Sequence, residues 1–131
     1  MARVLIVEDY PNLQMLYKKA LEAEGYEVTT ARDGEQALAA FDRQEPDLIL
    51  LDLLLPNKGG LEVLRAIKRE PVLAHIQVVV MTSFASPKEE AEIRSMGAFC
   101  RVKPGPMSLS GYDELAAEVM EICKGSAPEP G

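Results

Sequence analysis

Five polar side chains follow short apolar stretches of this sequence, and their types together suit the transfer of a phosphoryl group. They are two adjacent carboxylates, a third carboxylate, a hydroxyl and an amine: Glu8, Asp9, Asp52, Thr82 and Lys103. Carboxylates that share a cleft repel each other and favour a hard divalent cation such as Mg²⁺. An aspartate can accept a phosphoryl group, and a lysine offers a positive charge to phosphoryl oxygens. The residue types therefore predict phosphoryl transfer if the fold brings them to one place.

The apolar stretches that precede these residues are typical of strands in a parallel sheet. Several are almost continuously apolar, as expected for strands buried on both faces. We predict strands over residues 3–7, 27–30, 48–51, 77–81 and 99–102. Amphipathic stretches at helical spacing separate them, so the sequence predicts five β-α units. Right-handed connections between such units give an α/β fold, a doubly wound five-stranded parallel sheet with helices on both faces.

The starts and ends of the helices carry their own signals. Pro11 suits the first turn of the first helix, which is expected to end near Gly25. Ser86 and Pro87 are a cap and a first-turn proline for the fourth helix, which Gly97 ends. The second, third and fifth helices are expected to begin near Asp33-Gly34, Gly59-Gly60 and Tyr112-Asp113.

The position of the polar residues after the predicted strands distinguishes them from ordinary surface residues. Each residue alone has a common structural role: Asp9 as a helix cap, Asp52 as a loop residue, Thr82 as a helix-start hydroxyl and Lys103 as a solvated lysine. In doubly wound sheets, however, ligands bind at the carboxyl ends of the strands. Residues of suitable types at four of these ends predict a site at that edge.

Composition limits the class of protein. The chain has 131 residues, a formal net charge of −7 and 47% hydrophobic residues, which fits one globular domain. This acidic balance argues against direct nucleic-acid binding, which needs a basic face. No apolar stretch approaches the roughly 20 residues of a membrane span. Without an export signal, the two cysteines are expected to be reduced thiols in a cytoplasmic protein.

Longer stretches of the sequence resemble the receiver domains of two-component response regulators. The matching text is VLIVEDY, GYEVTTARDGEQAL, DLILLDLLLPNKGGLEVL, VVVMTS and VKP, within residues 3–124. The resemblance implies a flavodoxin-like fold with strand order 2-1-3-4-5 for residues 1–124. Residues 125–131, which are small, polar and rich in proline, are expected to form a flexible tail.

The resemblance also implies roles for the polar residues. Asp52 would be the phosphoacceptor, with Thr82 as the hydroxyl switch and Lys103 as the family's lysine. The ligands of Mg²⁺ would be Glu8, Asp9, Asp52 and the backbone carbonyl of Leu54. A sensor histidine kinase or a phosphotransfer protein would donate the phosphoryl group, and a downstream protein would bind the phosphorylated form. The chain would catalyse only its own phosphorylation and hydrolysis, so it is not expected to be a turnover enzyme.

Three features depart from the common pattern of this family. The aromatic switch position three residues before the lysine falls on Cys100, next to Phe99. Either Phe99 takes the switch role after a local rearrangement or, as we expect, the coupling of Thr82 to an aromatic ring is absent. The segment 104–111 is long, and it either delays the last helix or exposes an apolar patch. Apolar residues stand two positions after the phosphoacceptor and two after the threonine, at Leu54 and Phe84, which predicts slow self-dephosphorylation.

Two other functions remain open on sequence grounds. The first is a receiver-like module that binds its partner whether or not it is phosphorylated, an alternative suggested by Cys100 at the switch position. The second is a phosphatase that forms an aspartyl phosphate, but it would need a second aspartate where Leu54 stands.

Overall fold

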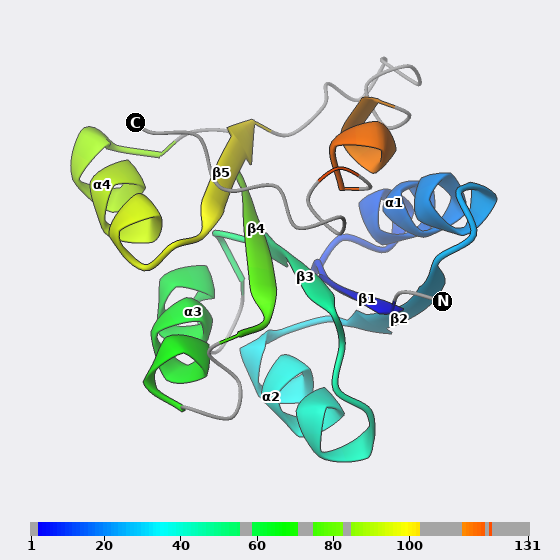
Figure 1. Ribbon diagram of the computed structural model, residues 1–131, viewed down its shortest axis with the longest axis horizontal. Coiled ribbons are helices and arrows are strands. Elements are labelled where there is room, and N and C mark those ends of the chain that lie inside the picture. The colour runs from blue at the N-terminus through cyan, green and yellow to red at the C-terminus, as the bar shows by residue number, and fades with distance from the viewer. Residues whose placement is uncertain are drawn as a thin grey trace.

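The five predicted strands form one parallel sheet, and this computed structural model describes residues 3–55, 59–70, 75–82, 85–102, 114–119 and 121 (Figure 1). The order of the strands in the sheet is β2-β1-β3-β4-β5, as the resemblance implied. The strands are β1 (Arg3–Val7), β2 (Glu27–Ala31), β3 (Leu48–Asp52), β4 (Gln77–Thr82) and β5 (Phe99–Val102). The first strand therefore lies between the second and the third.

Helices cover both faces of this sheet (Figure 1). They are α1 (Pro11–Ala23), α2 (Gly34–Arg43), α3 (Gly60–Arg69) and α4 (Pro87–Ser95), and residues 114–119 are also helical. The predicted starts of α1 to α4 are confirmed. The predicted start of the last helix near Tyr112, the long segment 104–111 and the tail 125–131 lie outside the described residues. Within the described part of the chain, no helix is both long and apolar enough to cross a membrane.

Side-chain caps explain why two of the helices start where they do. The Asp33 carboxylate accepts a hydrogen bond of 2.8 Å from the Gln36 N–H at the start of α2. At α4, the Ser86 hydroxyl accepts from the Glu89 N–H, and the Glu89 carboxylate accepts from the Ser86 N–H. Such caps satisfy N–H groups that the helix leaves without partners, and each contributes about 1 kcal/mol.

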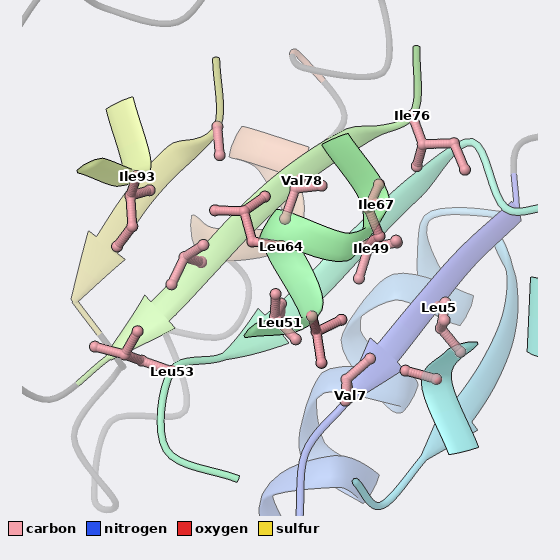
Figure 2. Packing of buried hydrophobic residues seen from close by; sticks show 14 of the residues in the cluster. Leu5, Val7, Ile49, Leu51, Leu53, Leu64, Ile67, Ile76, Val78 and Ile93 are labelled. Carbon is pink, nitrogen blue, oxygen red and sulfur yellow. The ribbon is translucent and has the colours of Figure 1, made fainter. Parts of the chain in front are cut away.

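Each face of the sheet has its own apolar core. The α1 face joins strand residues to α1 and to residues 114–119, and it includes Val4, Ile6, Leu48, Leu50, Val79, Met81, Tyr17, Leu21 and Val119. The α3 face joins the alternate strand residues to α2, α3 and α4, and it includes Leu5, Val7, Ile49, Leu51, Val78, Val80, Leu64, Ile67 and Ile93 (Figure 2). Full burial of one such side chain is worth about 1.5–3 kcal/mol. Because both faces are packed in this way, the two cores hold the strands, and with them their carboxyl ends, in place.

Neighbouring residues of β5 point to opposite faces, as they must in a strand. Phe99 is buried on the α1 face, whereas Cys100 packs against the core of the α3 face. In β4, Met81 lies on the α1 face and Val80 on the α3 face, so alternation places Thr82 on the α3 face. Phe99 and Thr82 consequently lie on opposite sides of the sheet, and Phe99 serves as a core residue.

Candidate functional site

Strand pairing aligns three of the predicted site residues along one edge of the sheet. Val7 pairs with Leu51, so Glu8 and Asp52 occupy the next positions at the carboxyl ends of β1 and β3. Thr82 ends β4 and pairs with Val102, the last residue of β5. Lys103 follows Val102 directly but lies outside the described residues.

Burial distinguishes these three side chains from the rest of the described chain. Glu8 is 2% exposed, Asp52 is 6% exposed and Thr82 is 4% exposed, and they are the buried polar or charged side chains among the described residues. Asp9, the neighbour of Glu8, is exposed. Burial of a carboxylate is costly unless hydrogen bonds or opposite charge compensate for it. Two buried carboxylates on adjacent strands therefore point to a functional edge.

The backbone around Glu8 is held by hydrogen bonds from α1 and β2. Its own N–H donates to the Ala31 carbonyl at 3.0 Å, and its carboxylate accepts from the Tyr10 N–H at 3.2 Å. The Gln14 amide donates to the carbonyls of both Glu8 and Ala31, at 3.1 and 3.2 Å. The Gln14 side chain thus links the end of β2 to the residue that follows β1. No pattern in the sequence signals this role, because a glutamine in an amphipathic helix is usually a surface residue.

The phosphoacceptor candidate Asp52 ends β3, and the chain turns away directly after it. Its carboxylate accepts a hydrogen bond of 3.2 Å from the Leu54 N–H, and the Leu53 N–H donates to the Met81 carbonyl at 3.0 Å. The Leu54 side chain is 77% exposed. A large apolar side chain therefore stands in solvent two residues after the buried carboxylate.

Gly60 allows α3 to begin directly against this turn. Its N–H donates to the Leu53 carbonyl at 3.0 Å. A Cβ at this position would overlap the carbonyl oxygen of Asp52 and would lie 2.8 Å from Leu53 Cα. Only glycine permits this approach without a backbone shift. The sequence places Gly60 in a loop that matches the receiver family, but the close approach is visible only in the structure.

The donor atoms at this edge suit a hard divalent cation, because they are carboxylate and carbonyl oxygens. Within the described residues, however, no three acidic, histidine or cysteine side chains form a group arranged to hold a metal ion. The carboxylates of Glu8 and Asp52 each accept a hydrogen bond from a backbone N–H two residues further along the chain. The donor atoms therefore fit Mg²⁺ in their chemistry.

Cys100 lies on the α3 face of β5, at the position where the family resemblance implies an aromatic switch residue. Burial, together with the nearby Glu90 carboxylate, raises the pKa of its thiol. A raised pKa keeps the thiol protonated at neutral pH, so Cys100 behaves as a small, half-buried apolar group. The side chain at this position of β5 is thus far smaller than an aromatic ring.

Comparison with known proteins agrees with this fold. The family model of the response regulator receiver domain matches residues 4–104. The polar-differentiation response regulator DivK of Brucella anthropi is 42% identical over 111 residues, which cover 85% of this chain and 89% of that protein.

Solved structures give the same result. The phosphorylated cyanobacterial phytochrome response regulator RcpA superposes with a TM-score of 0.80 at 31% identity, covering 99% of both chains. The Mn²⁺-bound form of response regulator Rcp1 has a TM-score of 0.80 at 28% identity, covering 100% of both chains.

A doubly wound sheet of order 2-1-3-4-5 with buried acidic side chains at the carboxyl ends of its strands is a flavodoxin-like architecture, which the receiver domains of response regulators share. This chain belongs to the response regulator receiver domain family. Receiver domains act in two-component signalling as phosphoacceptors, in contrast to enzymes that turn over a separate substrate.

Proposed function

We propose that this chain accepts a phosphoryl group on Asp52 from a histidine kinase or a phosphotransfer protein and then signals by binding a downstream protein. The observation that supports this most directly is the burial pattern. Glu8, Asp52 and Thr82 are buried polar side chains, and all three stand at the carboxyl ends of adjacent strands. Costly burial of polar side chains at one edge of the sheet is expected where that edge has a function.

The transfer itself needs a nucleophile, charge neutralisation and hydrogen-bond donors. An Asp52 carboxylate oxygen attacks the phosphorus of the donor's phosphohistidine, the P–N bond breaks, and the imidazole leaves with the bonding electron pair. The product on this chain is an acyl phosphate. The Thr82 hydroxyl would donate to one phosphoryl oxygen, and the Lys103 ammonium would pair with another.

Mg²⁺ would be held by the carboxylates of Glu8, Asp9 and Asp52 and by the backbone carbonyl of Leu54. When bound, the cation neutralises negative charge on the phosphoryl oxygens. The buried position of Glu8 and the exposed position of Asp9 divide the acidic pair between the interior and solvent. We further propose that residues 1–124 form the receiver domain, that residues 125–131 are a flexible tail, and that the protein acts in the cytoplasm.

The proposal is tested by the intact mass of the protein after incubation with acetyl phosphate. With Mg²⁺ present, we expect a gain of one phosphoryl group per chain. With the divalent cation removed by EDTA, we expect the mass to stay unchanged. No gain in the presence of Mg²⁺ would contradict the proposal.

The side chain of Leu54 is expected to prolong the life of the acyl phosphate. It is exposed beside Asp52 and cannot orient an attacking water by hydrogen bonding. A hydrogen bond of about 1 kcal/mol corresponds to roughly a fivefold rate, so Leu54→Asn is expected to shorten the phosphorylated lifetime about fivefold. The decay of the phosphorylated mass after donor removal measures it. Met15→Asn, at an exposed apolar residue of α1, is the matched control and is expected to leave the lifetime unchanged.

The second apolar residue expected to slow hydrolysis is Phe84, which lies outside the described residues. The double variant Leu54→Asn, Phe84→Glu is expected to shorten the lifetime further than Leu54→Asn does. A lifetime that neither variant changes would show that these side chains do not control hydrolysis.

One observation favours a second candidate function, a receiver-like module that binds its partner without phosphorylation. Phe99 is buried on the face opposite Thr82, and Cys100 presents no aromatic ring to α4. The usual coupling between threonine and an aromatic residue would then be missing. Equal affinity for the partner with and without a beryllofluoride mimic of the phosphoryl group would support this function over the first.

A further inference from the structure

A groove lies between α3 and the residue that follows α4. Its volume is about 580 Å³, and its walls are formed by Glu62, Arg65, Ala66, Lys68, Arg69 and Met96. Ligand-binding clefts commonly have volumes of about 300–1,000 Å³. The groove is therefore large enough to hold several side chains of a bound segment.

The groove is remote from the phosphoacceptor edge. Helix α3 begins at Gly60 against the carboxyl end of β3, and its other end reaches the amino end of β4, where Lys68 Nζ donates to the Ile76 carbonyl at 3.0 Å. Figure 2 shows the same direction, with Ile67 and Ile76 toward one end of the strands and Leu53 at the other. A ligand in the groove would thus lie at the amino ends of the strands, away from Asp52.

The charge of the groove is opposite to that of the whole chain. Three cationic side chains and one carboxylate line it, while the chain has a formal net charge of −7. Arg65, Lys68 and Arg69 are spaced three and four residues apart, which places them on neighbouring parts of one helix surface. A local positive surface on an acidic protein is complementary to an acidic partner.

The three cations are not equally available to a ligand. Arg65 forms a bidentate ion pair with Glu92 of α4, at 2.6 and 2.9 Å, and this pairing raises the pKa of Arg65 and lowers that of Glu92. Lys68 is half-buried, and burial lowers the pKa of its amine. Arg69 donates to the Arg65 carbonyl at 3.3 Å and pairs with no carboxylate within the described residues. Arg69 therefore has donors left for an external carboxylate.

We propose that this groove docks an acidic segment of a partner protein, with a carboxylate on Arg69 and an apolar side chain against Ala66 and Met96. The ion pair of Arg65 with Glu92 holds one wall in place, so the guanidinium there does not need to be ordered on binding. The planar guanidinium of Arg69 can pair with a carboxylate through two parallel hydrogen bonds. This docking does not depend on the function proposed for Asp52.

The test is a titration of the ¹⁵N-labelled full chain with a short peptide in which Asp-Glu pairs alternate with leucine. We expect saturable shifts of the amide signals of Arg65, Ala66, Arg69 and Met96. Arg69→Glu reverses the charge and is expected to weaken binding at least about tenfold, because the new carboxylate would repel the acidic peptide. Lys19→Glu, the same charge change on an exposed residue of α1, is the matched control and is expected to leave the affinity unchanged.

Several outcomes would overturn the proposal. The first is the absence of saturable shifts, and the second is a spectrum of folded Arg69→Glu that responds like the unmodified chain. Equal weakening by Lys19→Glu would show that the peptide is held by nonspecific charge attraction and not by the groove. The same shifts with inorganic phosphate would show a site for simple anions. Sedimentation that reveals a dimer, with the dimer excluding the peptide, would assign the groove to a second copy of this chain.

Discussion

Asp52→Asn is expected to abolish incorporation of a phosphoryl group from acetyl phosphate while leaving the fold intact. An amide oxygen is a poor nucleophile compared with a carboxylate, so no acyl phosphate can form at this position. The amide oxygen can still accept the hydrogen bond from the Leu54 N–H that the carboxylate now accepts at 3.2 Å. Asp52 is 6% exposed and ends β3, next to the end of β1, which the buried Glu8 follows. The substitution therefore also removes one of two buried negative charges at this edge. Intact mass measures the loss of phosphorylation, and thermal unfolding is expected to show no lower Tm.

Asp33→Asn is the matched control for this experiment. Asp33 caps α2, and asparagine caps a helix about as well as aspartate does. The control variant is expected to gain one phosphoryl group as the unmodified chain does. A phosphoryl group that still appears on Asp52→Asn would place the acceptor elsewhere in the chain.

Gly60→Ala is expected to lower the free energy of unfolding by about 3 kcal/mol, the upper end of the range for overpacking. The added Cβ would meet the backbone of Asp52 and Leu53, which cannot rotate away as the end of a flexible side chain can. Either α3 moves outward and loses packing of Val63 and Leu64, or the turn after β3 is displaced. Because Asp52 precedes this turn, phosphoryl incorporation is also expected to slow. Urea unfolding measures the free energy, and timed intact-mass samples measure the rate.

The neighbouring glycine provides a control with the same chemical change. A Cβ at Gly59 would meet no atom within 4 Å, and its φ of −64° suits any residue. Alanine caps a helix less well than glycine does, so Gly59→Ala is expected to cost no more than about 1 kcal/mol. Equal losses at the two positions would show that the turn after Asp52 tolerates the added atom.

The strands could be predicted from the sequence because both faces of the sheet are covered. A short, continuously apolar stretch bounded by polar residues, such as residues 48–51, is typical of a strand buried on both sides. Three strands nevertheless extend one residue further than predicted, through Ala31, Asp52 and Thr82. The polar side chains of Asp52 and Thr82 suggested that the strands had ended. Ladder hydrogen bonds use the backbone, so Asp52 still pairs with Met81 and Thr82 with Val102.

The edge that holds the candidate site could also be predicted, since the carboxyl ends of parallel strands must meet there. The contacts that support this edge could not be predicted from the sequence. The hydrogen bonds of Gln14 and the close approach at Gly60 depend on how helices dock, which no local pattern reports. Which of Phe99 and Cys100 lies on the same face of the sheet as Thr82 depended on the register of β5, because a shift of one residue exchanges the two faces. The roles proposed for Asp52, Thr82 and Lys103 stay predictions until phosphorylation is measured.

The position of β1 between β2 and β3 has a consequence for synthesis of the protein on the ribosome. β1 emerges first, and β2 can cover one of its edges once Glu27–Ala31 has been made. Its other edge pairs with β3, so it has no partner until Leu48–Asp52 has been translated. At about 5–20 residues per second, that edge of an apolar strand stays open for a few seconds. During this interval the nascent chain is a substrate for chaperones and for strand pairing with neighbouring chains.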